Sequence, residues 1–371
     1  MAKEKIANRQ LWIIIFIIRM TIVISLMPVL TSGDGLQDAW LSTLVVLAVS
    51  VIIVLVVALL DSKFIDKTII YYAQYLLGSY LGKVIIILLL WNFLQFAVME
   101  LRLYSEMIIT AFLPATPIFF IINGMIILSA VAAYMGVETI ARCADFIFFI
   151  LIIMLIFIIL IPIFDFDFAN LQPVLVRGWK PVLSSVVTPI ALMNQIWVIT
   201  VLGVNLTKPK KIIKTTTSAV ASAIGILLVV VVITIAVLGP HQGSRSVFPL
   251  LTLMRSVELG KIVQRTEIFI IFSWGMGLFI AVATYLYSFV KGVAQLFKLK
   301  DYRSLIWPTA VLVSLLTIYG FEGVFELNTF LCSGVYGRYG VITILLPLIL
   351  LWASYGLKLL TKKGELKNEK D

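Results

Sequence analysis

Histidine, cysteine and charged side chains are scarce in this sequence. Its 371 residues include one histidine and two cysteines, and only 13% are Asp, Glu, Lys or Arg. There is no CxxC pair and no cluster of cysteine and histidine, so the sequence predicts no metal site, no disulfide framework and no redox chemistry. A serine elbow and a Walker loop are also missing. We therefore expect no catalytic residues, no cofactor and no enzymatic activity.

Apolar residues are correspondingly abundant. They make up 61% of the chain, and the mean hydropathy is +1.10, whereas ordinary globular chains are about half apolar and about a quarter charged. Too few polar side chains remain to cover a water-exposed surface, and helices are the form in which a lipid-embedded backbone satisfies itself. The composition predicts an all-α polytopic membrane protein, with residues 1–371 forming one integral membrane domain.

Ten apolar stretches are long enough to cross a bilayer. We expect a cytoplasmic N-terminus at 1–10, a ten-helix bundle over 11–360 and a cytoplasmic tail at 361–371. The shortest stretch is the ninth. The predicted spans are 11–32, 38–60, 84–112, 117–135, 144–164, 182–204, 216–238, 267–290, 305–320 and 338–360.

Basic residues indicate the orientation. With the N-terminus inside, 20 of the 29 Lys and Arg residues fall on the inner side and 7 on the outer side, which predicts that both termini are cytoplasmic. The net charge of +10 is then a signal of topology. Because the basic residues are scattered over short loops, we expect contact with membrane lipid and no binding of nucleic acid.

An even count of ten spans suggests two halves of five helices with interrupted first members, a plan that transporters use to bind solutes at the bilayer midplane. Proline and hydroxyl side chains occur together in helices one and six. A proline frees a carbonyl that must find a partner in lipid, so each span is either broken at a binding site or simply kinked. The residues concerned are Thr21, Ser25 and Pro28 in helix one, and Ser184, Ser185, Thr188, Pro189 and Asn194 in helix six.

Charged residues inside spans are costly and usually face protein or water. Arg19 lies about 12 Å into helix one, if that helix starts at Leu11. It either lines a central cavity, where a ligand carboxylate could pair with it, or reaches back to the cytoplasmic surface.

A second group of charges, Glu100, Arg102 and Glu106, lies about 24 Å beyond Val84 in helix three. The four-residue spacing lets Arg102 pair with Glu106, while Glu100 points elsewhere. The group is either an ion-paired gate or a structural helix end near the outer headgroups.

Several segments occur in the order and at the spacings seen in the B subunits of spore germinant receptors, the GerAB family, and the resemblance covers nearly the whole chain. The segments are FIDKTIIYYAQYLLGSYLGK, RLYSEMIITAFLPATP, MGVETIARCADFI, LQPVLVRGWKPVL, NLTKPKK, FPLLTLMRSVELGKIVQRTEIFIIFSW and FKLKDYR.

This resemblance implies a LeuT-like fold of the amino acid, polyamine and organocation transporter superfamily. It also implies a nutrient-sensing subunit in the inner membrane of a bacterial spore, working with A and C subunits. Two departures affect the expected pocket: Arg19, Met20 and Thr21 stand where relatives usually carry a helix-one glycine, and Asn194 and Gln195 stand where many have Gly-Glu. Bulkier residues there should shrink the pocket or change its specificity.

We therefore predict a ligand site formed by Arg19, Thr21, Ser25, Thr188, Asn194 and Trp274. The predicted gating or ion-pair residues are Glu100, Arg102, Glu106, Glu138, Arg142, Arg265 and Glu267, and for the last four the structural alternative, a tie between a helix end and a neighbouring chain or loop, is favoured. The ligand would be a small nutrient, most simply an amino acid. The alternatives are a secondary transporter for an amino acid or polyamine, and a channel or assembly scaffold.

Replacing Arg102 tests the gate hypothesis. Arg102→Ala should abolish the response to germinants while the protein still accumulates in the membrane, because the paired charge on which gating depends is lost. Germination assays with an immunoblot of the spore membrane measure both quantities. A normal response at normal abundance would rule out the gate.

Overall fold

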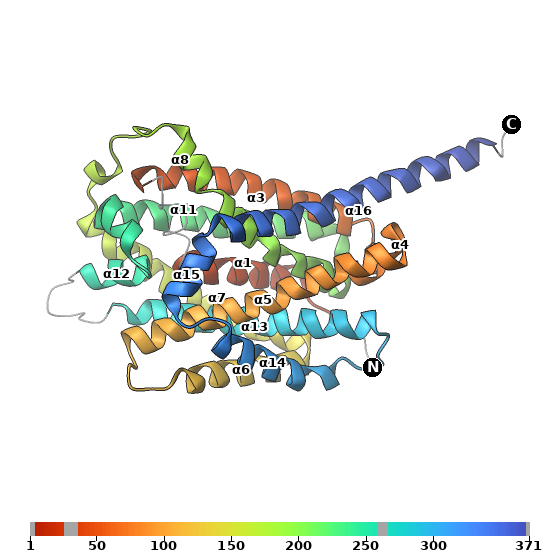
Figure 1. Cartoon of the computed structure of the whole chain (residues 1–371), viewed down its shortest axis with the longest axis horizontal. Helices are drawn as coiled ribbons and strands as arrows, with labels where there is room; N and C mark the ends of the chain where they lie inside the picture. Colours follow the sequence, from red (N-terminus) through yellow and green to blue (C-terminus); the bar gives the residue numbers. More distant parts are fainter. Residues whose placement is uncertain (1–3, 26–35, 258–265, 369–371) are drawn as a thin grey trace.

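The computed structural model describes residues 4–25, 36–257 and 266–368 and is helical almost throughout these ranges. Within them, the only β-type pairing is an isolated parallel bridge between Ile6 and Leu206. Long helices run side by side along one axis, and both ends of the chain lie at the same end of the bundle (Figure 1). This arrangement fits the expectation of an even number of crossings.

The membrane-length helices follow the predicted order. Eight helices or helical runs in the described ranges are long and apolar enough to span a bilayer, and the pair α14 and α15, bent by 97°, makes a ninth. The first predicted span is α1, which is described as far as Ser25. α1 is not one of these eight, and the run Trp179–Asn205, which is one of them, is described below. The bounds of the other long helices and of the bent pair are α1 (Asn8–Ser25), α3 (Ala39–Asp61), α5 (Ser79–Ala111), α6 (Ile118–Met135), α7 (Val137–Leu160), α11 (Ile212–Arg245), α13 (Ile268–Leu296), α14 (Ile306–Tyr319), α15 (Val324–Cys332) and α16 (Gly334–Asn368).

Shorter helices connect and cap the long ones. In chain order they are η1 (Leu36–Asp38), α4 (Ile69–Leu77), η2 (Ile161–Asp165), η3 (Phe168–Leu171), η6 (Pro209–Lys211), α12 (Pro249–Ser256) and η7 (Arg303–Leu305). Several predicted spans began too late or ended too early. The clearest case is α7, which begins at Val137 and not at residue 144. The reason is Gly136, whose φ of 100° lets α6 end and α7 begin within one residue.

Helix six is one helical run, Trp179–Asn205, that changes between α and 3-10 geometry along its length. The segment consists of α8 (Trp179–Ser184), α9 (Val187–Ala191), the 3-10 helix η4 (Leu192–Val198), α10 (Ile199–Leu202) and η5 (Gly203–Asn205). Every residue of η4 is buried. Helix one is regular from Asn8 to Ser25, and Pro28, around which the break was expected, lies outside the described residues.

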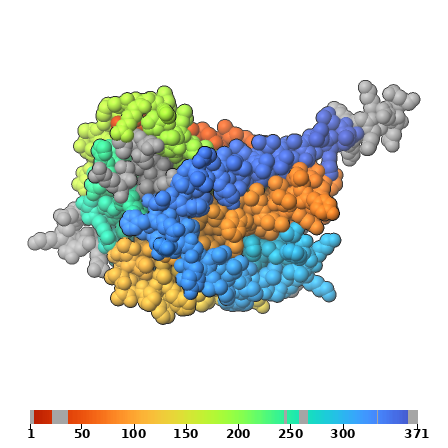
Figure 2. All heavy atoms as spheres, in the orientation of Figure 1, coloured from red at the N-terminus to blue at the C-terminus, as the bar shows by residue number. Residues whose placement is uncertain are grey.

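The core surrounds α1, which packs against α7, α11 and α13. Consecutive residues of α1 from Ile13 to Thr21 are buried on all sides, as expected for a helix in the centre of a bundle. Large apolar side chains such as Ile52, Phe120 and Phe146 are instead exposed on the outer helices, which suits a surface in contact with lipid tails. The far end of α16 projects beyond the bundle (Figures 1 and 2).

Small residues allow the closest helix approach. A Cβ added to Gly340 on α16 would collide with the Cβ of Ala191 and lie 2.9 Å from its Cα. The same approach brings the carbonyl of Gly340 within 2.6 Å of the amide nitrogen of Asn194. Because Gly340 has no side chain, the backbone of α16 packs directly against helix six, as is common between membrane helices.

Gly340→Ala should lower the free energy of unfolding by about 1–3 kcal/mol, because the added methyl group meets backbone that cannot move aside. Thermal unfolding of the detergent-purified protein measures the change. Gly225→Ala is the matched control, since nothing lies within 4 Å of its Cβ position and alanine favours a helix interior. Equal stability of Gly340→Ala and the parent protein would contradict this packing.

Candidate functional site

A closed polar cluster lies where α1, α5, η4 and α13 meet. Its members are Arg19, Thr21, Glu100, Gln195 and Tyr285, and each is at most 2% exposed. Burial of a carboxylate and a guanidinium so far from water is expensive unless partners compensate them. The hydrogen bonds of the cluster therefore decide what it can do.

Glu100 is the acceptor at the centre of the cluster. Its carboxylate oxygens accept hydrogen bonds from Thr21 Oγ1 at 2.9 Å, from Gln195 Nε2 at 2.7 Å and from Tyr285 OH at 2.9 Å. Three donors from three different helical segments thus converge on one side chain. Glu100 thus couples helix one, helix six and α13 through three hydrogen bonds.

Arg19 is only partly satisfied. Its Nη1 donates to the carbonyl of Leu192 at 3.1 Å and to Gln195 Oε1 at 3.1 Å. The Nε and Nη2 atoms are buried and have no hydrogen-bond partner in the structure. Gln195 therefore relays between Arg19 and Glu100, and two guanidinium nitrogens retain the capacity to bind an acceptor such as a carboxylate.

Three of the other predicted ligand residues, Asn194, Trp274 and Thr188, make their contacts outside this cluster. Asn194 donates to the carbonyls of Ala191 and Gly340 and to Thr343 Oγ1, so its amide ties helix six to α16. The ring of Trp274 packs at its edge against Tyr104, with 5.7 Å between ring centroids, and its buried indole nitrogen has no partner in the structure. Thr188 lies beside Gly337 on α16, and the side chain of Ser25 is outside the described part of the chain.

Arg102 and Glu106 form a buried ion pair with an N–O distance of 2.7 Å. Arg102 Nη1 also donates to the carbonyls of Thr317 and Ile318, each at 2.9 Å. These carbonyls belong to the last turn of α14, just before the 97° bend into α15, and such carbonyls need donors from outside their helix. Arg102 thus holds the end of α14, and a guanidinium at a helix C-terminus is favourable.

Three of the remaining charged candidates, Glu138, Arg142 and Glu267, lie at or near helix N-termini. Arg142 and Glu138 are 3.9 Å apart, with side chains 79% and 42% exposed, so their pair is weak. Glu138 also accepts the backbone amide of Lys5 at 2.8 Å. Glu267 immediately precedes α13, and Arg265 lies outside the described residues.

Sequence reasoning missed Gln195 and Tyr285 as members of the cluster. Gln195 stood out only as a departure from the family pattern, although an amide in an apolar span requires a partner. Tyr285 carried a weaker signal, a tyrosine hydroxyl in the middle of an apolar helix, where a buried hydroxyl usually finds an acceptor.

The helical architecture matches that of solved transporters at low sequence identity, so the likeness concerns the fold alone. MhsT in complex with L-phenylalanine aligns with a TM-score of 0.68 and 15% identity over 92% of this chain and 89% of MhsT. Mhp1, a nucleobase-cation-symport-1 family transporter with bromovinylhydantoin bound, aligns with a TM-score of 0.67 and 13% identity over 92% of this chain and 78% of its own. The protein is an all-α membrane protein with the predicted LeuT-like fold.

The chain belongs to the spore germination protein family, whose model matches residues 5–322. Spore germination protein YndE of Bacillus subtilis (strain 168) is 28% identical over 338 residues, which cover 91% of this chain and 93% of YndE. Spore germination protein KB of the same organism is 28% identical over 322 residues, covering 86% of each chain. The family expected from the sequence motifs is confirmed.

Tyr285→Phe should destabilise the bundle by about 1–3 kcal/mol, because it leaves the buried carboxyl of Glu100 without one of its donors. Tyr319→Phe is the control, since Tyr319 is 81% exposed. In a Glu100→Leu background the Tyr285→Phe change should lose most of its effect. Unfolding measurements on the four proteins of this cycle give the coupling, and additive effects would show that the 2.9 Å contact contributes no stability.

Proposed function

We propose that this protein is the membrane-embedded nutrient-sensing subunit of a spore germinant receptor, with the ligand site at the polar cluster. The observation that carries the proposal is the pair of partnerless nitrogens on buried Arg19, next to the 3-10 segment of helix six. A small nutrient with a carboxylate, most simply an amino acid, would supply the missing acceptors. MhsT, which shares the fold, was solved in complex with L-phenylalanine, and this complex supports an amino acid as the ligand.

The cluster is closed to solvent, so ligand binding requires helix six to move. Gln195 is the natural moving part, because it is the side chain that joins Arg19 to Glu100 and it sits in the irregular η4. A carboxylate on Arg19 would release the Gln195 amide, and a ligand shifts a two-state equilibrium only by such a difference in affinity. The new arrangement would pass to the A and C subunits.

The clamp between Arg102 and the end of α14 offers a second moving part. We propose that it acts as the outer gate, because α14 and α15 meet at a sharp bend there. The single membrane domain would lie in the inner membrane of the spore, with both termini in the cytoplasm. The surplus of basic residues on the inner segments supports this orientation.

A secondary transporter is the rival function, favoured by the solved transporters that share the fold. Purified protein in liposomes separates the two. Concentrative uptake of an amino acid or polyamine driven by a proton or sodium gradient favours transport, whereas binding without uptake favours sensing.

Arg19→Gln should weaken the response to a carboxylate nutrient by at least about tenfold, because a charge-assisted pair is lost, and should change the response to a sugar far less. Germination rates of spores over a range of nutrient concentrations provide the measurement. Arg177→Gln, an exposed arginine on the outer loop, is the matched control. Equal losses for both nutrients at normal protein abundance would count against a carboxylate contact.

A further inference from the structure

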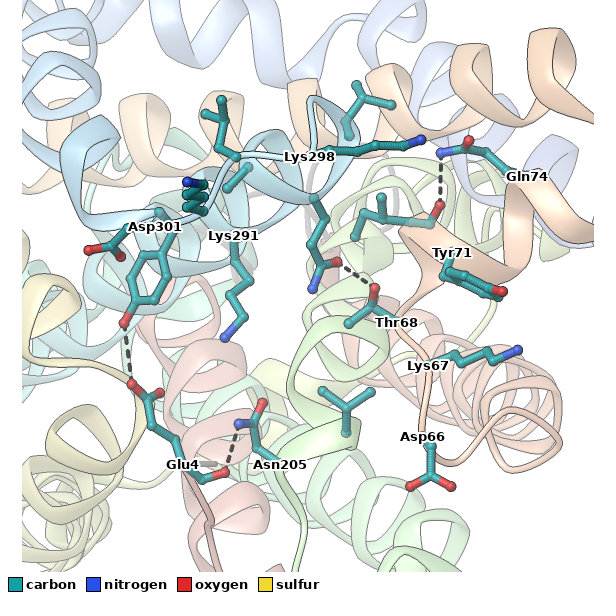
Figure 3. A pocket seen from close by; sticks show the side chains of 18 of the residues that line it. Glu4, Asp66, Lys67, Thr68, Tyr71, Gln74, Asn205, Lys291, Lys298 and Asp301 are labelled. Carbon is teal, nitrogen blue, oxygen red and sulfur yellow. Dashed lines mark hydrogen bonds between the residues drawn. The ribbon is translucent and has the colours of Figure 1, made fainter. Parts of the chain in front are cut away.

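A large pocket opens at the end of the bundle where both termini lie, away from the polar cluster. Its volume is about 970 Å³, and it is enclosed by the N-terminal segment, α4, the end of α13 and the loop 297–303. Figure 3 shows its lining side chains, among which Glu4, Lys67, Lys291 and Lys298 come from separate segments. A cavity of this size is typical of small-molecule sites.

The pocket carries positive charge that its own acids do not neutralise. Lys67, Lys291 and Lys298 line it, and no described carboxylate oxygen lies within 4.0 Å of their amines. Lys291 Nζ instead donates to Tyr287 OH at 3.0 Å and lies 5.1 Å from the centroid of the Tyr302 ring. Figure 3 shows that Lys67 and Lys298 reach other parts of the pocket, Lys67 with its amine 4.2 Å from the centroid of the Tyr71 ring. The amine on the side of Glu4 is that of Lys291, and an ammonium group in a concave surface attracts anions.

Glu4 already occupies one corner of this pocket, but its contacts are long. Its carboxylate accepts from the amide of Val137 at 3.2 Å, from Tyr287 OH at 3.3 Å and from Tyr302 OH at 3.4 Å. Arg303 Nη2 lies 3.7 Å away. Charge-assisted hydrogen bonds are normally about 2.7–2.9 Å long, so an acceptor that lies closer to the Val137 amide and the two phenols would compete with Glu4 for them.

The chemistry of the corner suits an oxyanion. Burial raises the pKa of Tyr302 to about 12, so its hydroxyl remains a donor at neutral pH. Gly136 leaves the space, since a Cβ on it would collide with Glu4 Oε1 and lie 2.8 Å from its Cδ. The groups around the Glu4 carboxylate are thus two phenols, one backbone amide and one guanidinium, and the ammonium of Lys291 lies beside one of the phenols, Tyr287.

We propose that this pocket binds a phosphate group or another compact oxyanion, in competition with the carboxylate of Glu4. The anion takes the donors that now hold Glu4 and is neutralised by Lys291. Its source is either a free anion or the headgroup of an anionic lipid, which share this chemistry.

Competition with Glu4 loosens the N-terminal segment. The segment is tied to the end of helix six by backbone bonds from Ile6 to the carbonyl of Asn205 at 2.8 Å and from Thr207 to the carbonyl of Ile6 at 3.0 Å. The side chain of Asn205 adds a bond to the carbonyl of Glu4 at 2.9 Å. An anion that displaces Glu4 thus weakens a direct link between the N-terminus of helix one and helix six.

Titration of the full-length protein with inorganic phosphate tests the proposal. In nanodiscs of neutral phosphatidylcholine, calorimetry should show saturable binding that Lys291→Gln weakens about tenfold and Lys291→Arg retains. Glu4→Gln should tighten binding, because the competing charge is gone. Lys83→Gln, an exposed lysine outside the pocket lining, should have no effect. Hydrogen exchange at the amides of Ile6 and Thr207 should become faster on saturation with phosphate.

A second arm distinguishes the two sources. If phosphate fails to bind in neutral discs but discs of phosphatidylglycerol accelerate exchange at Ile6, and Lys291→Gln removes the acceleration, the anion is a lipid headgroup. Absence of both effects overturns the site. If neither Lys291→Gln nor Glu4→Gln changes phosphate binding, the anion binds at other lysines, and the proposed site is overturned as well. Binding without faster exchange overturns the competition with Glu4.

Discussion

The structure depends on one buried carboxylate, Glu100, being satisfied in a place that water does not reach. Lipid cannot solvate charge, so each donor must come from the protein itself. Thr21, Gln195 and Tyr285 supply them from three helical segments, and Arg19 is joined through Gln195. The arrangement of helix one, helix six and α13 is thereby constrained together, because moving any one of them exposes an unpaired polar group.

Irregular backbone in helix six makes this network possible. The 3-10 geometry of η4 presents the Leu192 carbonyl to Arg19 while Gln195 faces both charged groups. Asn194, its neighbour, faces the opposite way and bonds to α16. One short segment therefore joins the polar cluster to the last long helix. In the proposed mechanism, ligand binding at Arg19 would move η4. This movement would be transmitted through packed helices to α16 and to the bend between α14 and α15, without a second ligand.

The sequence was sufficient for the fold, because lipid permits so few solutions. Long apolar runs in water-poor surroundings become helices, so the run lengths predicted a helical bundle, and the resemblance of the motifs to a family implied the LeuT-like fold. Side-chain partners were less accessible. The four-residue spacing pointed to the pairing of Arg102 with Glu106, since both lie on one helix. Neither Tyr285 nor Gln195 could be assigned to Glu100, because those contacts join residues far apart in the chain. The hydrogen bond from Asn194 to Gly340 was not predictable either, because it depends on how closely helix six and α16 pack.

The central claim is that the carboxylate of a nutrient occupies the two partnerless nitrogens of Arg19. Solid-state NMR of the protein with ¹⁵N-labelled arginine and a germination-triggering amino acid labelled with ¹³C at its carboxylate measures this contact directly. The account predicts a dipolar coupling to Arg19 that corresponds to a carbon–nitrogen distance of about 4 Å or less, as in a paired guanidinium and carboxylate. A bound nutrient whose carboxylate shows no coupling to Arg19 would contradict it.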